Sequence, residues 1–244
     1  MDDPAPDPAV VAPRPEHHHR DVRGGAARAA VFGVSDGLVS NVGLILGVAG
    51  ADPAPSVVRV AGLAGLIAGA ISMAAGEYNS MKVQTELLQR ELEMERIELR
   101  RNPHVETVEL TQIYQSRGVD PDRARELAEQ MMADPDMALQ THAREELGID
   151  PDKLGSPTGA SVSSFFAFAI GAFVPLLPWF IGSGTGAVVA SMILGAVASI
   201  VVGTLLARFT GRSVVFSASR QLAIAVFAAG VTFLVGRAVG VGVS

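Results

Sequence analysis

The chain has 244 residues, of which 49% are hydrophobic and 18% charged, and its mean hydropathy is +0.35. All 25 Asp and Glu residues lie at or before Asp152, so the last third has no acidic side chain. A soluble surface needs charges of both signs, so this composition excludes a water-soluble C-terminal third. The absence of cysteine excludes disulfides and thiolate metal sites. The net charge of -6 gives no reason to expect a nucleic-acid partner.

Residues 1–24 are rich in Pro, Asp and His and show no apolar periodicity. They lack the apolar core of a signal peptide, and we expect a disordered N-terminal tail. The run His17-His18-His19 could contact a metal ion. A solvated tail is the favoured interpretation, because nothing nearby fixes the geometry of the three imidazoles.

Five apolar segments follow the tail, and each can cross a hydrocarbon core of about 30 Å as a helix. We therefore predict an all-α, polytopic membrane protein with five transmembrane helices. Pro175 and Pro178 are expected to kink or unwind the third helix. The predicted spans are about Ala27–Ala49, Val57–Met81, Ser161–Ile181, Ala187–Ala207 and Val214–Val235.

The domain division follows from these spans: the tail, transmembrane helices 1–2 in residues 25–81, a hydrophilic insert in 82–155, and transmembrane helices 3–5 in 156–244. Lys and Arg are abundant before the first span and in the insert, and absent from the link between the first two spans. Positive charge favours the cytoplasmic side. The N-terminus and the insert are therefore predicted to be cytoplasmic.

The insert carries 17 acidic and 10 basic residues and is predicted to be an acidic helical metal-binding domain. No helix breaker occurs in Lys82–Arg101, so the second span should continue as a helix until Asn102-Pro103. Further helices are predicted over 104–117, from Asp120 to Met132, and from Asp134 to Leu147. The last two begin at Asp-Pro pairs, a combination typical of a helix N-terminus.

Two carboxylates and a thioether fall within the first two spans. A carboxylate in a bilayer costs about 2.5–3.5 kcal/mol on insertion scales and usually marks an ion or proton path. Asp36 and Met73 are expected at similar depth, with Glu77 one helical turn nearer the cytoplasm. Together with an amide or hydroxyl oxygen from Asn41 or Ser40, they could bind a partly dehydrated divalent cation.

The alternative interpretation of these carboxylates is structural. Asp36 and Glu77 would then pair with Arg28 or Lys82 near the inner surface of the membrane. Met73 would then face lipid or the protein core.

A second group of acidic residues lies in the insert. Glu95 and Glu98 share one helix face, and Glu106 and Glu109 share a face of the next helix. If the turn at Pro103 folds the second helix back, the two pairs face each other and repel unless a cation lies between them. The alternative is a solvated face with salt bridges to the interleaved arginines.

No arrangement typical of an enzyme emerges: the sequence has no Gly-rich phosphate loop and no His-x-x-x-His pair. We therefore predict that the protein is not an enzyme and needs no cofactor. His142 precedes Glu145 and Glu146 by one helical turn. It could complete a metal site or lie on a helix surface.

Two motifs carry a family resemblance. Residues 36–48, DGLVSNVGLILGV, resemble the first-helix signature of the vacuolar iron transporter family, and residues 69–78, GAISMAAGEY, look like its second-helix signature. The acidic insert and three Gly-rich spans match the layout of the family. The resemblance covers about residues 20–240.

The resemblance implies a homodimer that moves Fe2+, and often Mn2+, out of the cytosol in exchange for protons. It implies a path near the dimer axis, at the positions of Asp36, Met73 and Glu77. It further implies metal binding by the insert, where some family members have methionines at the positions of His142 and Ala143. The matching glutamates of the insert are Glu95, Glu98, Glu106, Glu109 and Glu146.

The predicted function is a proton-coupled exporter of Fe2+ or another divalent transition metal. The abundance of Arg, Ala and Gly is typical of a GC-rich bacterial genome, which favours the cell membrane as the location. One alternative is an exporter selective for Mn2+ or Ca2+. The other is a membrane-anchored metal sensor or adaptor without transport.

Overall fold

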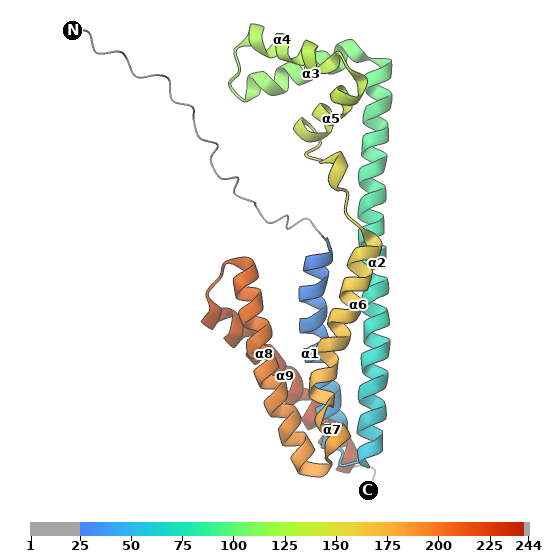
Figure 1. Cartoon of the computed structure of the whole chain (residues 1–244), viewed down its shortest axis with the longest axis vertical. Coiled ribbons are helices and arrows are strands. Elements are labelled where there is room, and N and C mark those ends of the chain that lie inside the picture. Colours follow the sequence, from blue (N-terminus) through green and yellow to red (C-terminus); the bar gives the residue numbers. More distant parts are fainter. Residues whose placement is uncertain (1–24, 242–244) are drawn as a thin grey trace, which may run out of the picture.

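The computed structural model describes residues 25–241, and this range contains helices and no strand (Figure 1). The histidines of the tail lie outside the described residues. The helices are α1 (Gly25–Gly50), α2 (Pro55–Arg101), α3 (Pro103–Ser116), α4 (Pro121–Met132), α5 (Pro135–Glu145), α6 (Pro157–Phe173), α7 (Pro178–Ile181), α8 (Gly184–Thr210) and α9 (Val214–Val241), with short 3-10 turns η1 (Pro151–Lys153) and η2 (Val174–Leu176).

Five of the helical stretches are long and apolar enough to cross a membrane: α1, the first part of α2, the stretch Pro151–Leu176 that contains α6, then α8 and α9. The five predicted spans are thereby confirmed as helices of sufficient length. The second span continues without a break through Arg101 and ends at Asn102, before Pro103, as the sequence predicts. Figure 1 shows α2 running the whole length of the molecule.

The third span is interrupted where its prolines predict. Helix α6 ends at Phe173 and is followed by η2 and α7. Helix α8 supplies a replacement hydrogen bond: the Ser191 hydroxyl donates to the carbonyl of Pro175 at 2.7 Å, and Ser191 Oγ in turn accepts from the Trp179 indole N–H at 3.1 Å. The carbonyl of Pro175 is therefore satisfied inside the protein.

Close contact between α1 and α6 depends on glycine. A methyl group at Gly37 would overlap the carbonyl oxygen of Phe168, and one at Gly171 would overlap the carbonyl oxygen of Val34. Each helix therefore presents a bare backbone to the other, which is how membrane helices gain van der Waals contact.

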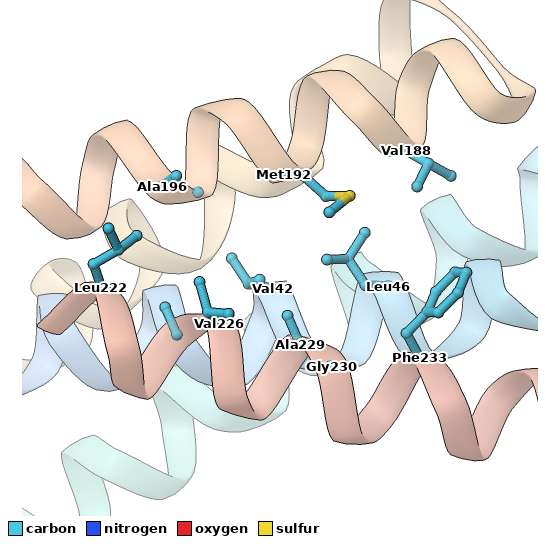
Figure 2. A pocket seen from close by; sticks show the side chains of 12 residues that line it. Val42, Leu46, Val188, Met192, Ala196, Leu222, Val226, Ala229, Gly230 and Phe233 are labelled. Atoms are coloured by element: carbon cyan, nitrogen blue, oxygen red, sulfur yellow. The ribbon is translucent and has the colours of Figure 1, made fainter.

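An apolar pocket of about 250 Å³ lies between α1, α8 and α9 (Figure 2). Its twelve lining residues are all apolar or glycine, among them Val42, Met192 and Phe233. A divalent cation needs oxygen or nitrogen ligands, so this pocket is not a cation site.

Helices α3, α4 and α5 gather beside the far end of α2 (Figure 1). The side chain of Asp120 accepts hydrogen bonds from the first turn of α4, and Asp134 does the same for α5, as the Asp-Pro pairs predict. The chain then returns to α6 along α2, where the Thr85 hydroxyl donates to the carbonyl of Leu154 at 3.2 Å.

Candidate functional site

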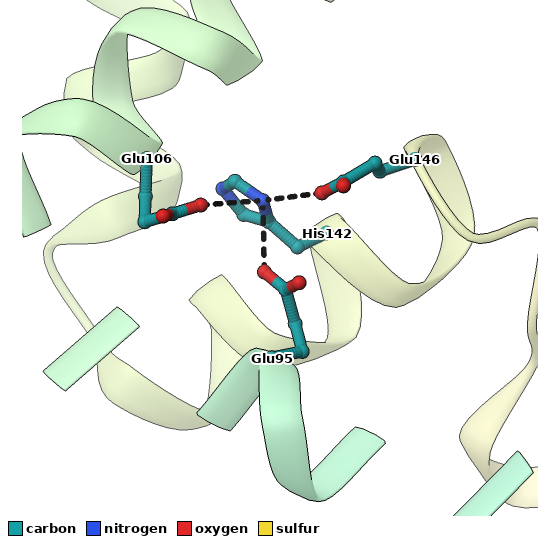
Figure 3. Close-up of side chains that lie close together, drawn as sticks. All are labelled: Glu95, Glu106, His142 and Glu146. Atoms are coloured by element: carbon teal, nitrogen blue, oxygen red, sulfur yellow. Dashed lines mark hydrogen bonds and ion pairs between the residues drawn. The ribbon is translucent and has the colours of Figure 1, made fainter. Parts of the chain in front are cut away.

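Four side chains of types that can ligate a metal ion meet between α2, α3 and α5 (Figure 3). Glu95, Glu106, His142 and Glu146 each offer one ligand atom, and these four atoms lie within 4.8 Å of one another. The imidazole Nδ1 of His142 is 3.1 Å from Glu95 Oε1, 3.8 Å from Glu106 Oε2 and 3.4 Å from Glu146 Oε2. We call these four residues the insert cluster.

Local sequence features bring the four together. The break at Asn102-Pro103 turns α3 away from the axis of α2, so Glu106 can approach Glu95. His142 and Glu146 are four residues apart at the end of α5, so their side chains lie on one face. Helix α5 packs against α2.

Burial makes the insert cluster electrostatically unusual. Glu95, Glu106 and His142 are buried, whereas Glu146 is exposed at the open side. Burial, together with the negative charges of Glu146 and Glu106, raises the pKa of Glu95 to about 7. Burial also raises the pKa of Glu106, against the lowering effect of the nearby His142.

The donor set of the insert cluster fits a divalent metal. Within residues 25–241, Glu95 Oε1 and His142 Nε2 are buried atoms without a well-formed hydrogen bond. Buried polar atoms of this kind are rare and need an explanation. A cation among three carboxylates and an imidazole nitrogen would satisfy Glu95 Oε1 and neutralise the repulsion, and this mixture of oxygen and nitrogen suits first-row transition metals.

Two predicted glutamates lie outside the insert cluster. Glu98 is exposed and Glu109 half-buried, and neither belongs to the four-residue group. Both are close enough for their charges to raise the pKa of Glu95. The structure therefore brings together three of the five predicted glutamates, with His142 at their centre.

Of the three candidate ligands in the first two spans, two lie at one pocket and the third lies outside it. Asp36 and Met73 line one pocket of about 280 Å³ between α1, α2 and α6. Glu77 does not line this pocket. Its carboxylate accepts from Arg28 at 3.3 Å, the ion pair that the structural interpretation of Glu77 predicts. The other suggested partner, Lys82, pairs with Glu86 instead.

Comparison with known proteins agrees with the two sequence motifs. The sequence model of the VIT family matches residues 27–237. A vacuolar iron transporter of Acanthamoeba castellanii is 39% identical over 212 residues, which cover 83% of this chain and 75% of that protein. Vacuolar iron transporter 1 of Oryza sativa is 32% identical over 91% of this chain and 90% of its own length. Vacuolar iron transporter 1 of Arabidopsis thaliana gives the same identity and the same coverage. This chain is a membrane protein that belongs to the VIT family.

Proposed function

We propose that this protein transports Fe2+, or a related divalent transition metal such as Mn2+, across a membrane in exchange for protons. The observation that carries the proposal is the insert cluster, a group of three carboxylates and one imidazole of which all but Glu146 are buried, in a five-span protein whose relatives are named iron transporters. We further propose a homodimer in a cell membrane that exports the metal, with the insert on the cytoplasmic side.

In this proposal the insert cluster captures the ion. Residues 82–155 carry seven more acidic than basic side chains, and such a field raises the local concentration of cations. Glu146 stands at the open side and meets the ion first. Glu95, Glu106 and His142 then replace its remaining water.

The second site is the pocket lined by Asp36 and Met73, which we call the membrane pocket. Asp36 and Met73 bind the partly dehydrated ion there. Glu77 binds the ion on its way to this pocket, after the ion pair between Glu77 and Arg28 has opened. Metal and proton compete for the same carboxylate. Protonation of Asp36 from the opposite side therefore releases the ion and couples its movement to an inward flow of protons.

Reconstitution into liposomes tests the proposal. Fe2+ or Mn2+ added on one side should cross the membrane and drive a measurable proton counterflow, and Asp36→Asn should abolish both. Proton movement that persists in Asp36→Asn would reject the role given to Asp36. Metal binding without any flux would support a sensor or adaptor instead, and preferential flux of Ca2+ would support an exporter of different selectivity.

A further inference from the structure

A buried amide stands in the wall of the membrane pocket. Asn41 of α1 is 2% exposed, and its Nδ2 donates to the carbonyl oxygen of Ala172 at 2.6 Å. A backbone carbonyl oxygen only accepts hydrogen bonds, so this contact determines which end of the amide is nitrogen. The orientation of the Asn41 oxygen is therefore set by the hydrogen bond to Ala172 at the end of α6.

The Oδ1 atom of Asn41 has no hydrogen-bond partner among residues 25–241. An amide oxygen that is buried without a partner costs free energy. Helix α2 comes close to this oxygen because the facing residue is Gly65, where an added methyl group would lie only 3.1 Å from Oδ1. Both Asn41 and Gly65 line the same pocket as Asp36 and Met73.

The hydroxyl of the neighbouring Ser40, unlike the Asn41 oxygen, has a hydrogen-bond partner. Ser40 Oγ donates to the carbonyl of Asp36 at 2.6 Å, a bond within the same helix. Of the two neutral oxygens that the sequence offers near Asp36, only that of Asn41 is both buried and unpartnered within residues 25–241.

We infer that Asn41 Oδ1 is a ligand for the divalent cation in the membrane pocket, where it replaces one water of the hydration shell. This assignment rests on the proposed function and adds a third protein ligand to Asp36 and Met73. A neutral amide oxygen adds no charge, so the site contains a single carboxylate that a proton can neutralise. The hydrogen bond to Ala172 orients the oxygen before the ion arrives.

The test measures Mn2+ binding to the full-length protein in detergent by the loss of the free-ion EPR signal. The background protein carries Glu95→Gln/Glu106→Gln, which removes metal binding by the insert cluster. The Mn2+ binding that is lost when Asp36→Asn is added to this background is the binding at the membrane pocket. In that background Asn41→Leu should weaken Mn2+ binding at least about tenfold. Asn41→Asp, which keeps an oxygen in place, should bind Mn2+ within about threefold of the background or more tightly.

The Asn41 pair separates a ligand from a structural role. Neither Leu nor a carboxylate can donate the Nδ2 hydrogen bond to Ala172, so a purely structural role would weaken Mn2+ binding and lower Tm equally in both variants. That result would overturn the assignment, as would unchanged Mn2+ binding in Asn41→Leu or the absence of any Asp36-dependent binding.

Gln221→Leu is the matched control. It removes another buried interhelical amide, whose Nε2 donates to Ser35 Oγ at 2.8 Å, and Gln221 does not line the pocket. Its Mn2+ binding should equal that of the background.

A flux measurement distinguishes failure of the Asn41 assignment from failure of the proposed transport function. In liposomes, with the insert cluster intact, Asn41→Leu should lower Mn2+ uptake while Asn41→Asp retains it. If the unchanged protein binds Mn2+ through Asn41 but moves none, transport fails and the ligand assignment stands. If the unchanged protein and Asn41→Leu transport equally well, the ligand assignment alone fails.

Discussion

The Nδ1 atom of His142 lies 3.1 Å from Oε1 of Glu95, and both side chains are buried. The contact joins α5 to α2, two helices whose contributing residues are 47 positions apart in the chain. The imidazole offers a nitrogen atom to a group that otherwise offers only carboxylate oxygens. Ca2+ and Mg2+ prefer oxygen, whereas imidazole suits iron, zinc, copper and nickel.

The first prediction concerns this nitrogen. His142→Gln keeps a polar side chain of similar size but replaces the ring nitrogen with an amide. We expect the affinity of the insert cluster for Co2+, relative to Ca2+, to fall about tenfold or more. Titration calorimetry of the full-length protein with each metal measures this ratio.

His104→Gln is the control for that substitution. His104 is exposed on α3 and lies outside the insert cluster, so the preference for Co2+ should not change. An unaltered Co2+ to Ca2+ ratio in His142→Gln would show that His142 is not a ligand.

The second prediction concerns pH. The pKa of Glu95 is about 7 in the folded protein, above its ordinary 4.5. The folded state therefore holds this proton more tightly than the unfolded chain. The stabilisation is complete below about pH 4.5 and is lost as the pH rises through about 7. In a chelator, the Tm of the metal-free protein should fall between about pH 5 and about pH 8.

Bound metal should reverse this dependence, because the cation needs the ionised carboxylate. Glu95→Gln cannot titrate, so its metal-free Tm should vary less with pH than that of the unchanged protein. Thermal unfolding in detergent, with and without saturating Mn2+, gives all four curves. A metal-free Tm that rises with pH in the same interval would contradict the direction assigned to Glu95.

The third prediction concerns the contact between α1 and α6. Gly171→Ala places a methyl group against the carbonyl oxygen of Val34, and we expect it to destabilise the protein by about 1–3 kcal/mol. Gly186→Ala in α8 has no atom within 4 Å of the new methyl group and should leave Tm unchanged or raise it. Equal Tm values for the two variants would show that α1 and α6 can move apart without cost.

The fourth prediction separates the two interpretations of Glu77. If Glu77 binds the ion on its way to the pocket, Glu77→Gln should raise the KM for metal severalfold. Arg28→Gln should lower the KM, because it frees the Glu77 carboxylate. The double variant should behave like Glu77→Gln. If the ion pair is only structural, each single change should lower Tm and leave KM unaltered. Liposome uptake at graded metal concentrations, alongside thermal unfolding, distinguishes these outcomes.

Much of the architecture could be predicted because its determinants are local. Apolar run length indicates each span, and the pairs Asp120-Pro121 and Asp134-Pro135 mark where α4 and α5 begin. The position of Pro103 likewise predicts the end of α2. These signals require no knowledge of what the helices pack against.

The membership of the insert cluster depended on information that the spacing of residues does not contain. Glu98 and Glu109 share helix faces with Glu95 and Glu106, yet neither belongs to the four-residue group. The burial of His142 follows from the packing of α5 against α2. Its spacing from Glu146 was the available signal, but that spacing is equally typical of an exposed helix.

The pairing of Glu77 was also undecided by sequence. Both Arg28 and Lys82 were candidate partners for Glu77, and the packing of α1 beside α2 selects Arg28.

Helix α2 has 47 residues and carries both Met73 and Glu95 without a break. The two residues are 22 positions apart, which corresponds to about 33 Å at 1.5 Å per residue, far too long for one ion to touch both sites. Because a continuous helix is stiff, a small tilt at one end moves the other end by a larger distance. A tilt of about 5° at the pocket swings Glu95 by about 3 Å on this geometry, comparable to the separations among the four ligand atoms. Since Glu106 and His142 belong to other helices, a tilt of α2 that those helices do not follow would separate the residues of the insert cluster.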